Sequence, residues 1–208
     1  MKVISFSLYG DDPMYECGLK ENLKLCKLVY PDWEPHVFVE RMYQGTLDAH
    51  VHYCGDSLDH SGMLWRFQPF FWPEATHCIV RDADSRVGAM EAAAVNEWLI
   101  SGMLCHAMHD HPHHTSHPIS GGMFGMVCNI LPKFTERMLA AKTYNKLPRV
   151  GDMDFLAMYV WPLVAKRCLR HSSVPVRWPY KPFPVVDRTM FIGQRFEFDN
   201  KPKDKNWR

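Results

Sequence analysis

The first forty residues follow a strand–loop–helix–strand pattern, which restricts the possible folds more than any other feature. Residues 3–8 (VISFSL) form an apolar run typical of a buried strand. Apolar residues then recur at helical spacing over about 15–28, after a turn in which an aspartate before Pro13 can cap the helix. A second strand is expected over residues 36–40. This order is the repeating unit of a parallel sheet, so we expect an α/β fold with helices flanking a mostly parallel central sheet.

A later apolar run, residues 78–80, ends abruptly in the charged sequence RDADSR. Two carboxylates without partners would cost several kcal/mol in an apolar core, so Asp82 and Asp84 are expected at the carboxyl end of this strand. Residues at i and i+2 of an extended segment share a face, and the pair can present oxygens to one hard cation, Mg²⁺ or Mn²⁺. The simpler alternative is a charged turn in which the acids pair with Arg81 and Arg86.

Three more residues of the first half are candidates for contact with a ligand. Tyr9 and Asp11 lie in the loop after the first strand, where the tyrosine can stack on a base and the aspartate can hydrogen-bond to it. The alternative is a surface tyrosine beside a helix cap. Arg66 lies within the aromatic segment 63–72, where Pro69 argues against a long straight helix. This arginine can pair with a carboxylate near the cation or contact a phosphate.

The second half continues the alternation of helices and strands. Ser85 is the expected cap of the next helix, and Gly102 is its expected stop. The paired glycines Gly121 and Gly122 indicate a tight turn or backbone close to a ligand. The predicted elements are helices over residues 87–101, 131–148 and 152–164, and strands over 103–108 and 168–176.

The length and composition are those of one ordinary globular domain. The chain has 208 residues, of which 47% are hydrophobic and 23% charged. Its net charge of +1 gives no overall attraction to nucleic acid or to an anionic membrane. No stretch approaches the roughly 20 apolar residues of a membrane span. Seven cysteines without a C-x-x-C pair, and no signal peptide, favour reduced thiols in a cytoplasm.

Together these motifs resemble those of nucleotide-sugar-dependent glycosyltransferases of the GT-A fold, in particular the small single-domain proteins of bacteria and large phages. The matching segments are SLYGDD at 7–12, WRF at 65–67, RDADSR at 81–86, HDHPHH at 109–114, SGGMFG at 120–125, GDMDFL at 151–156 and FIGQRF at 191–196. The resemblance implies a GT-A-like domain over residues 1–199, with a nucleotide-binding part to about residue 86, an acceptor-side part over 87–199 and a polar tail at 200–208. It also implies the cytoplasm of a bacterial or phage-infected cell.

The resemblance implies roles for individual residues at the donor. Asp82 and Asp84 would hold Mn²⁺ or Mg²⁺ on the diphosphate of a nucleotide sugar, expected to be UDP-linked, and Tyr9 and Asp11 would receive the nucleobase. In glycogenin-like members a histidine completes the metal shell and a later lysine contacts the diphosphate. His171 and Lys181 are similar to that pair, and Gly121 and Gly122 would border the sugar.

The expected chemistry follows from these residue types. A divalent cation neutralises the leaving diphosphate, and Lys181, Arg81 or Arg86 would add positive charge. An inverting enzyme also needs a carboxylate that deprotonates the acceptor hydroxyl, for which Asp154 is the first candidate and Asp152 the second. A retaining enzyme needs no such base, and the sequence leaves the stereochemistry open. As a structural alternative, two acids at a helix start suit the helix dipole.

Two other functions compete with sugar transfer. The histidine-rich segment 109–114 has the density of a zinc site, which favours a metal-dependent hydrolase, although its spacing is not that of H-E-x-x-H. A non-catalytic nucleotide- or sugar-binding protein is the second competitor.

The acceptor is expected to be either a cell-surface glycan or a hydroxymethylated phage DNA base. DNA would require a local basic groove. The basic residues that can form one are Lys166, Arg167, Arg170, Arg177, Lys181 and Arg188.

Overall fold

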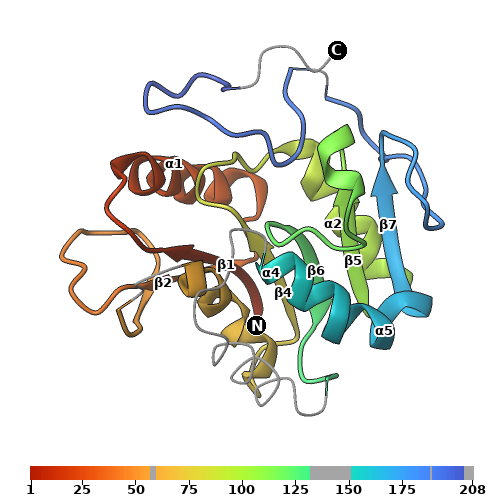
Figure 1. Ribbon diagram of the computed structural model, residues 1–208, viewed down its shortest axis with the longest axis horizontal. Helices are drawn as coiled ribbons and strands as arrows, with labels where there is room; N and C mark the ends of the chain where they lie inside the picture. The colour runs from red at the N-terminus through yellow and green to blue at the C-terminus, as the bar shows by residue number, and fades with distance from the viewer. Residues whose placement is uncertain (57–59, 132–150, 188, 204–208) are drawn as a thin grey trace.

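A single seven-stranded sheet forms the centre of the molecule (Figure 1). The computed structural model describes residues 1–56, 60–131, 151–187 and 189–203. The strand order is β3-β2-β1-β4-β6-β5-β7, and of the described strands only β6 is antiparallel to its neighbours. The strands are β1 (Lys2–Leu8), β2 (Glu34–Val39), β3 (His50–Tyr53), β4 (His77–Arg81), β5 (Cys105–His109), β6 (Met123–Val127) and β7 (Cys168–Ser172). The predicted single-domain α/β fold with a mostly parallel sheet is confirmed.

Helices cover both faces of the sheet and enclose the two larger of three apolar clusters. The helices are α1 (Pro13–Val29), α2 (Ala89–Ser101), α4 (Gly151–Phe155) and α5 (Trp161–Val164), the 3₁₀ helices η1 (His60–Phe71), η2 (Pro112–Thr115) and η4 (Ala165–Arg167), and the π-helix η3 (Leu156–Val160). On one face α1 and α2 pack through Leu19, Leu23 and Trp98. On the other face η1 and α4 pack through Phe67 and Phe155, so the aromatic segment around Pro69 is a core element.

Several local predictions can be compared with the structure. Asp12 caps α1 by accepting from the amide of Met14 at 2.9 Å, and Gly102 ends α2 at φ 68°, both as expected. The cap of α2 is Gly88, not Ser85, whose hydroxyl instead donates to the Asp82 carbonyl. β6 was not predicted, because the sequence indicated only a turn at its preceding glycines. The helix predicted over 131–148 falls outside the described residues from 132 onward.

The C-terminal segment, residues 189–203, returns across the loops that follow β4 and β5. The blue chain crosses the top of the view in Figure 1, above α1 and α2. The Phe196 amide donates to the Asp84 carbonyl at 2.9 Å, and the Ile192 amide donates to Asp110 at 2.9 Å. Of the expected tail, Asn200 accepts from Arg86 Nε at 2.9 Å, while residues 204–208 lie outside the described chain.

Two broader expectations concern membranes and thiols. Among the described helices none is both long enough and apolar enough to cross a bilayer. All seven cysteines are free thiols, as the absence of a disulfide pattern in the sequence indicates.

Candidate active site

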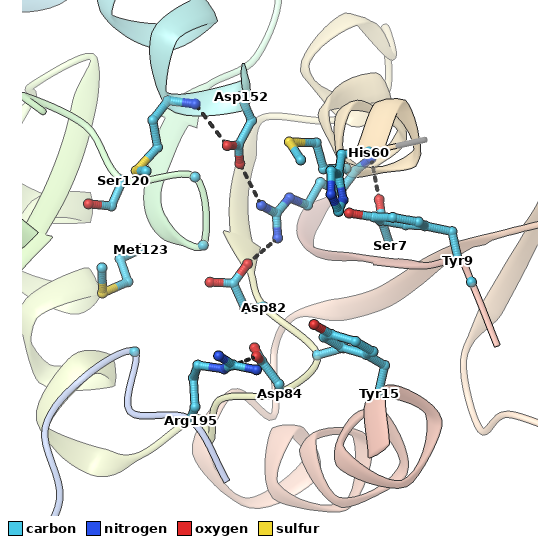
Figure 2. A pocket seen from close by; sticks show the side chains of 18 of the residues that line it. Ser7, Tyr9, Tyr15, His60, Asp82, Asp84, Ser120, Met123, Asp152 and Arg195 are labelled. Carbon is cyan, nitrogen blue, oxygen red and sulfur yellow. Dashed lines mark hydrogen bonds and ion pairs between the residues drawn. The ribbon is translucent and has the colours of Figure 1, made fainter. Parts of the chain in front are cut away.

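A cleft of about 700 Å³ opens at the carboxyl ends of β1 and β4. These strands are neighbours in the sheet, so the loops that follow them meet at one edge. The other walls come from η1, the turn at residues 120–123, the start of α4 and the C-terminal segment (Figure 2). The cleft brings together eight of the twelve residues predicted from the sequence: Tyr9, Asp11, Arg66, Asp82, Asp84, Gly121, Gly122 and Asp152.

Arg66 joins two acids of the cleft that come from different elements. Its Nη1 donates to Asp82, and its Nη2 donates to Asp152 at 2.8 Å (Figure 2). Two serines of β1 fix the backbone of η1 at this point: Ser5 donates to the Arg66 carbonyl at 2.7 Å, and the Arg66 amide donates to Ser7 at 3.0 Å. Burial alone lowers the pKa of Arg66, but the two carboxylates raise it above its usual value. The guanidinium therefore stays charged.

Asp82 and Asp84 both face the cleft from the loop after β4. Asp84 accepts from Arg195 Nε at 2.8 Å, and the side chain of Asp82 is 39% exposed. Burial and the nearby charge of Asp82 raise the pKa of Asp84, while Arg195 opposes that rise. A divalent cation would relieve the repulsion between these acids. They do not form the predicted ion pairs with Arg81 and Arg86.

Asn22 of α1 holds the loop after β4 in place. It is fully buried, its Nδ2 donates to the Ser85 carbonyl at 2.8 Å, and its Oδ1 accepts from the Val87 amide at 3.1 Å. One turn earlier, Gly18 allows close approach, because a Cβ there would collide with the Ala83 carbonyl. Nothing in the sequence marks Asn22 as buried, since asparagine in a helix is mostly exposed.

The backbone at Gly121 and Gly122 packs closely against two carboxylates of the cleft. A Cβ on Gly121 would overlap the carboxylate of Asp152, and a Cβ on Gly122 would overlap that of Asp82. Both glycines are therefore needed for close packing, which agrees with the expectation of a tight approach at this turn.

Tyr9 forms another wall beside η1. Its ring packs edge-on against Trp65 with centroids 6.1 Å apart, and it lies so close to Gly62 that a Cβ there would overlap it. Burial raises the pKa of Tyr9 to about 12, so the phenol is neutral and can donate a hydrogen bond. Asp11 is exposed at the same edge.

Comparison with known proteins adds one finding about the fold. No protein-family model matches the chain, and no curated protein matches it by sequence. Among solved structures, one that matches is a glycosyltransferase involved in the glycosylation of the major capsid of PBCV-1, with a TM-score of 0.55 and 15% identity over 82% of this chain and 81% of that chain. The chain shares the fold of a glycosyltransferase. At this identity the likeness concerns the fold alone.

Within this glycosyltransferase fold, Arg81 lies outside the cleft. Its side chain is 1% exposed, and its Nε donates to Glu91 at 2.8 Å in the core beside Tyr30. Arg81 thus balances a buried acid of α2 and cannot reach a diphosphate in the cleft. Arg86 is also buried and packs over the ring of Phe196 at 4.7 Å.

His171 and Lys181 are also separated from the cleft. β7 lies three strands from β4, about 14 Å at the usual strand spacing. His171 is fully buried, with Nδ1 2.9 Å from His106 Nε2 and Nε2 3.1 Å from Glu97. Lys181 pairs with the same glutamate. The structure therefore gives this pair no place in a metal shell built on Asp82.

The two acids of the GDMDFL segment have different surroundings. Asp152 lines the cleft, and burial raises its pKa while Arg66 opposes that rise. Asp154 is not among the residues that line the cleft; its side chain is 55% exposed and pairs with His117 at 3.1 Å. Of the two candidates named from the sequence, Asp152 is therefore the one that lines the cleft.

The histidine-rich segment 109–114 does not form a zinc triad. Three converging ligand atoms occur only once among the described residues, at another place in the sheet. His113 and His114 line the cleft, and burial lowers the pKa of His114 to about 3, so this ring is neutral. The hydrolase alternative loses its main support, and these histidines are available for polar contact with a ligand.

Arg195 is a cleft residue that sequence reasoning missed. It comes from the C-terminal segment, 111 positions after Asp84. The FIGQRF motif pointed to this region, but no pattern of spacing connects an arginine here with an acid so far away in the chain.

Proposed function

We propose that this protein is a GT-A-type glycosyltransferase. It transfers a sugar from a nucleoside diphosphate sugar, in this case a UDP-sugar, to an acceptor hydroxyl. The decisive observation is that one cleft unites the loop after β1, the D-x-D acids after β4 and the acid at the start of α4. These three groups correspond to a base site, a diphosphate site and a sugar site in a chain that shares a glycosyltransferase fold.

The donor's diphosphate would be held through Mn²⁺ or Mg²⁺ bound to Asp82 and Asp84. The two acids fit such a cation, because Mg²⁺-type sites commonly use one or two carboxylates and complete their shell with phosphate and water. The cation would neutralise the leaving diphosphate. Arg195, beside Asp84, would contribute positive charge at the same wall, and Tyr9 with Asp11 would receive the nucleobase.

The sugar would lie over the turn of Gly121 and Gly122, facing Asp152. Arg66 would fix the carboxylate of Asp152 and keep it ionised. We therefore assign the acceptor-side role to Asp152 in preference to Asp154. An ionised carboxylate at this position can orient a hydroxyl or accept its proton.

We propose a glycan acceptor rather than DNA. Two of the six basic residues considered for a DNA groove are engaged elsewhere: Arg170 is buried and packs over Trp161 at 4.7 Å, and Lys181 pairs with Glu97. Arg188 lies outside the described residues. His113 and His114, at the rim of the cleft, are suited to hydrogen bonds with sugar hydroxyls.

A panel of nucleotide sugars tests the proposal, with donor hydrolysis scored in the presence of Mn²⁺ and then after addition of chelator. We expect turnover of at least one UDP-sugar, loss of that turnover with chelator, and loss in Asp84→Asn. Asp32→Asn, which changes an exposed aspartate just after the C-terminal end of α1 and outside the cleft lining, is the matched control and should keep full activity. No turnover of any donor would refute the transferase, and nucleotide binding without turnover would identify a binding protein. With the donor that is turned over, transfer of the sugar to glycans is then compared with its transfer to hydroxymethylated DNA.

A further inference from the structure

Three histidines and a glutamate gather on the outer strands of the sheet, away from the cleft. In the parallel pairing of β2 with β3, His36 is opposite His50 and Phe38 is opposite His52. Glu34 precedes His36 by two residues and shares its face. His36 lies three residues, about 10 Å, before the end of β2, whereas the cleft lies beyond the strand ends. The cluster is therefore a separate feature.

Three ligand atoms converge in this cluster. One atom each from Glu34, His36 and His50 lies within 4.8 Å of the others, and Glu34 Oε2 is 3.8 Å from His50 Nε2 and 4.0 Å from His36 Nε2. Tetrahedral zinc, with bonds of about 2.0–2.1 Å, holds its ligand atoms about 3.4 Å apart. The His50 ring stacks on His36 with centroids 4.6 Å apart, so it must turn before both lone pairs point at one ion, and the side chains of Glu34 and His50 are 50% and 61% exposed, which leaves them room to do so.

The surroundings of His36 leave one ring nitrogen for a metal. Its Nδ1 lies 2.8 Å from His52 Nε2, while its buried Nε2 has no hydrogen-bond partner in the described chain. A histidine that donates Nδ1–H to a neighbour presents the Nε2 lone pair, which is the usual arrangement of a metal-ligating imidazole. Trp72 packs against His36 and His52, with ring centroids 4.9 and 5.1 Å apart, and restricts both rings.

We propose that Glu34, His36 and His50 form a binding site for a divalent transition-metal ion such as Zn²⁺, which ties edge strand β3 to β2. Two imidazoles and one carboxylate suit Zn²⁺, in contrast to the all-oxygen pair of the cleft. Three protein ligands leave a fourth position for water. β3 is the sheet's edge and has only four residues, so a bridging metal would stabilise a weakly held strand.

The test uses the 208-residue chain, freed of metal with a chelator. It is titrated with Co²⁺, whose visible absorption reports its ligands, and Zn²⁺ is then added to displace the Co²⁺. We expect a saturable spectrum that Zn²⁺ abolishes, and a melting temperature raised by Zn²⁺. His50→Ala and Glu34→Gln alter exposed side chains, so the fold should persist while the affinity for both ions falls at least about tenfold.

His113→Ala is the matched control, because it removes an exposed histidine from the other histidine-rich segment. It should bind both ions as the unmodified protein does. Asp84→Asn should likewise leave the Co²⁺ spectrum unchanged, which separates this site from the cleft. Undiminished affinity in His50→Ala, or no binding of either ion by the unmodified protein, would overturn the proposal.

Discussion

At the scale of single residues, the cleft is organised by one buried cation. Arg66 pairs with both Asp82 and Asp152, and without it two carboxylates would face each other in a partly desolvated space. Removing the partner of a buried acid is strongly destabilising, whereas removing the partner of an exposed acid is not. The side chain of Asp152 is 8% exposed and that of Asp82 is 39% exposed, so Asp152 determines the effect of losing Arg66.

We expect Arg66→Met to lower the free energy of unfolding by about 3 kcal/mol at pH 7. Burial raises the pKa of Asp152 and Arg66 opposes that rise, so the variant should raise it further. As the pH falls, the folded variant would then bind a proton on Asp152 before the unfolded chain does. Its loss in the free energy of unfolding, relative to the unmodified protein, should therefore shrink as the pH falls from 7 to 5. Urea denaturation at both pH values measures this. A deficit that is equal at both, or larger at pH 5, would show that Asp152 is not the cause.

The glycine turn gives a second prediction at this scale. In Gly122→Ala the new Cβ would overlap the Asp82 carboxylate and displace it. A displacement of about 1 Å at such a site can lower the rate by roughly 10²-fold, so metal-dependent turnover of the nucleotide sugar should fall by that order. Gly55→Ala, at a position where a Cβ meets nothing within 4 Å, is the control and should keep the normal rate. Equal rates in both variants would contradict a close approach at Gly122.

At the scale of elements, the C-terminal segment is the least expected part of the fold. It has no regular secondary structure, yet Phe196 is 8% exposed and lies beneath the Arg86 guanidinium, and Arg195 reaches Asp84. The segment is therefore held by a few side chains and by hydrogen bonds to the loop after β4. It completes one wall of the cleft from a distant part of the chain.

Phe196→Ala should loosen this segment. We expect a loss of about 2–3 kcal/mol in the free energy of unfolding, at the lower end for a buried aromatic because the site lies near the surface. Limited proteolysis should cut the segment first. Phe198→Ala is the matched control, since Phe198 is 64% exposed, and it should change stability by less than about 0.5 kcal/mol. Similar losses in the two variants would indicate that Phe196 does not anchor the segment.

At the scale of the whole molecule, one sheet and its core join the segments before and after residue 86. β4 leads into the D-x-D acids and pairs with β1 on one side and with β6 on the other. One apolar core contains Val80 of β4, Phe124 of β6 and Phe155 of α4. The proposed division near residue 86 therefore does not separate two folding units.

We expect a single cooperative thermal transition, with equal calorimetric and van't Hoff enthalpies. A fragment of residues 1–86 should not fold by itself, because β4 would lose β6 and half of its core. Calorimetry of the whole chain tests for the single transition. The dispersion of the amide NMR resonances of the fragment tests whether the fragment folds. Two transitions, or a folded fragment, would show that the nucleotide-binding part is an independent domain.

The sequence by itself determined the local elements and the edge at which a ligand would bind. Periodicity and turn residues predicted β1, α1, β2 and β4, and the cost of burying Asp82 and Asp84 predicted their position at a strand end. These features depend on neighbours in the chain.

The tertiary structure decided which distant residues meet. Only folding brings Arg66 between Asp82 and Asp152, Arg195 to Asp84, and Asn22 to the loop after β4. It also removes Arg81 into the core and His171 to a strand three places away. The physical reason is that an ion pair or a metal shell depends on distances in space, which strand order and helix packing set, whereas residue spacing fixes geometry only within one element.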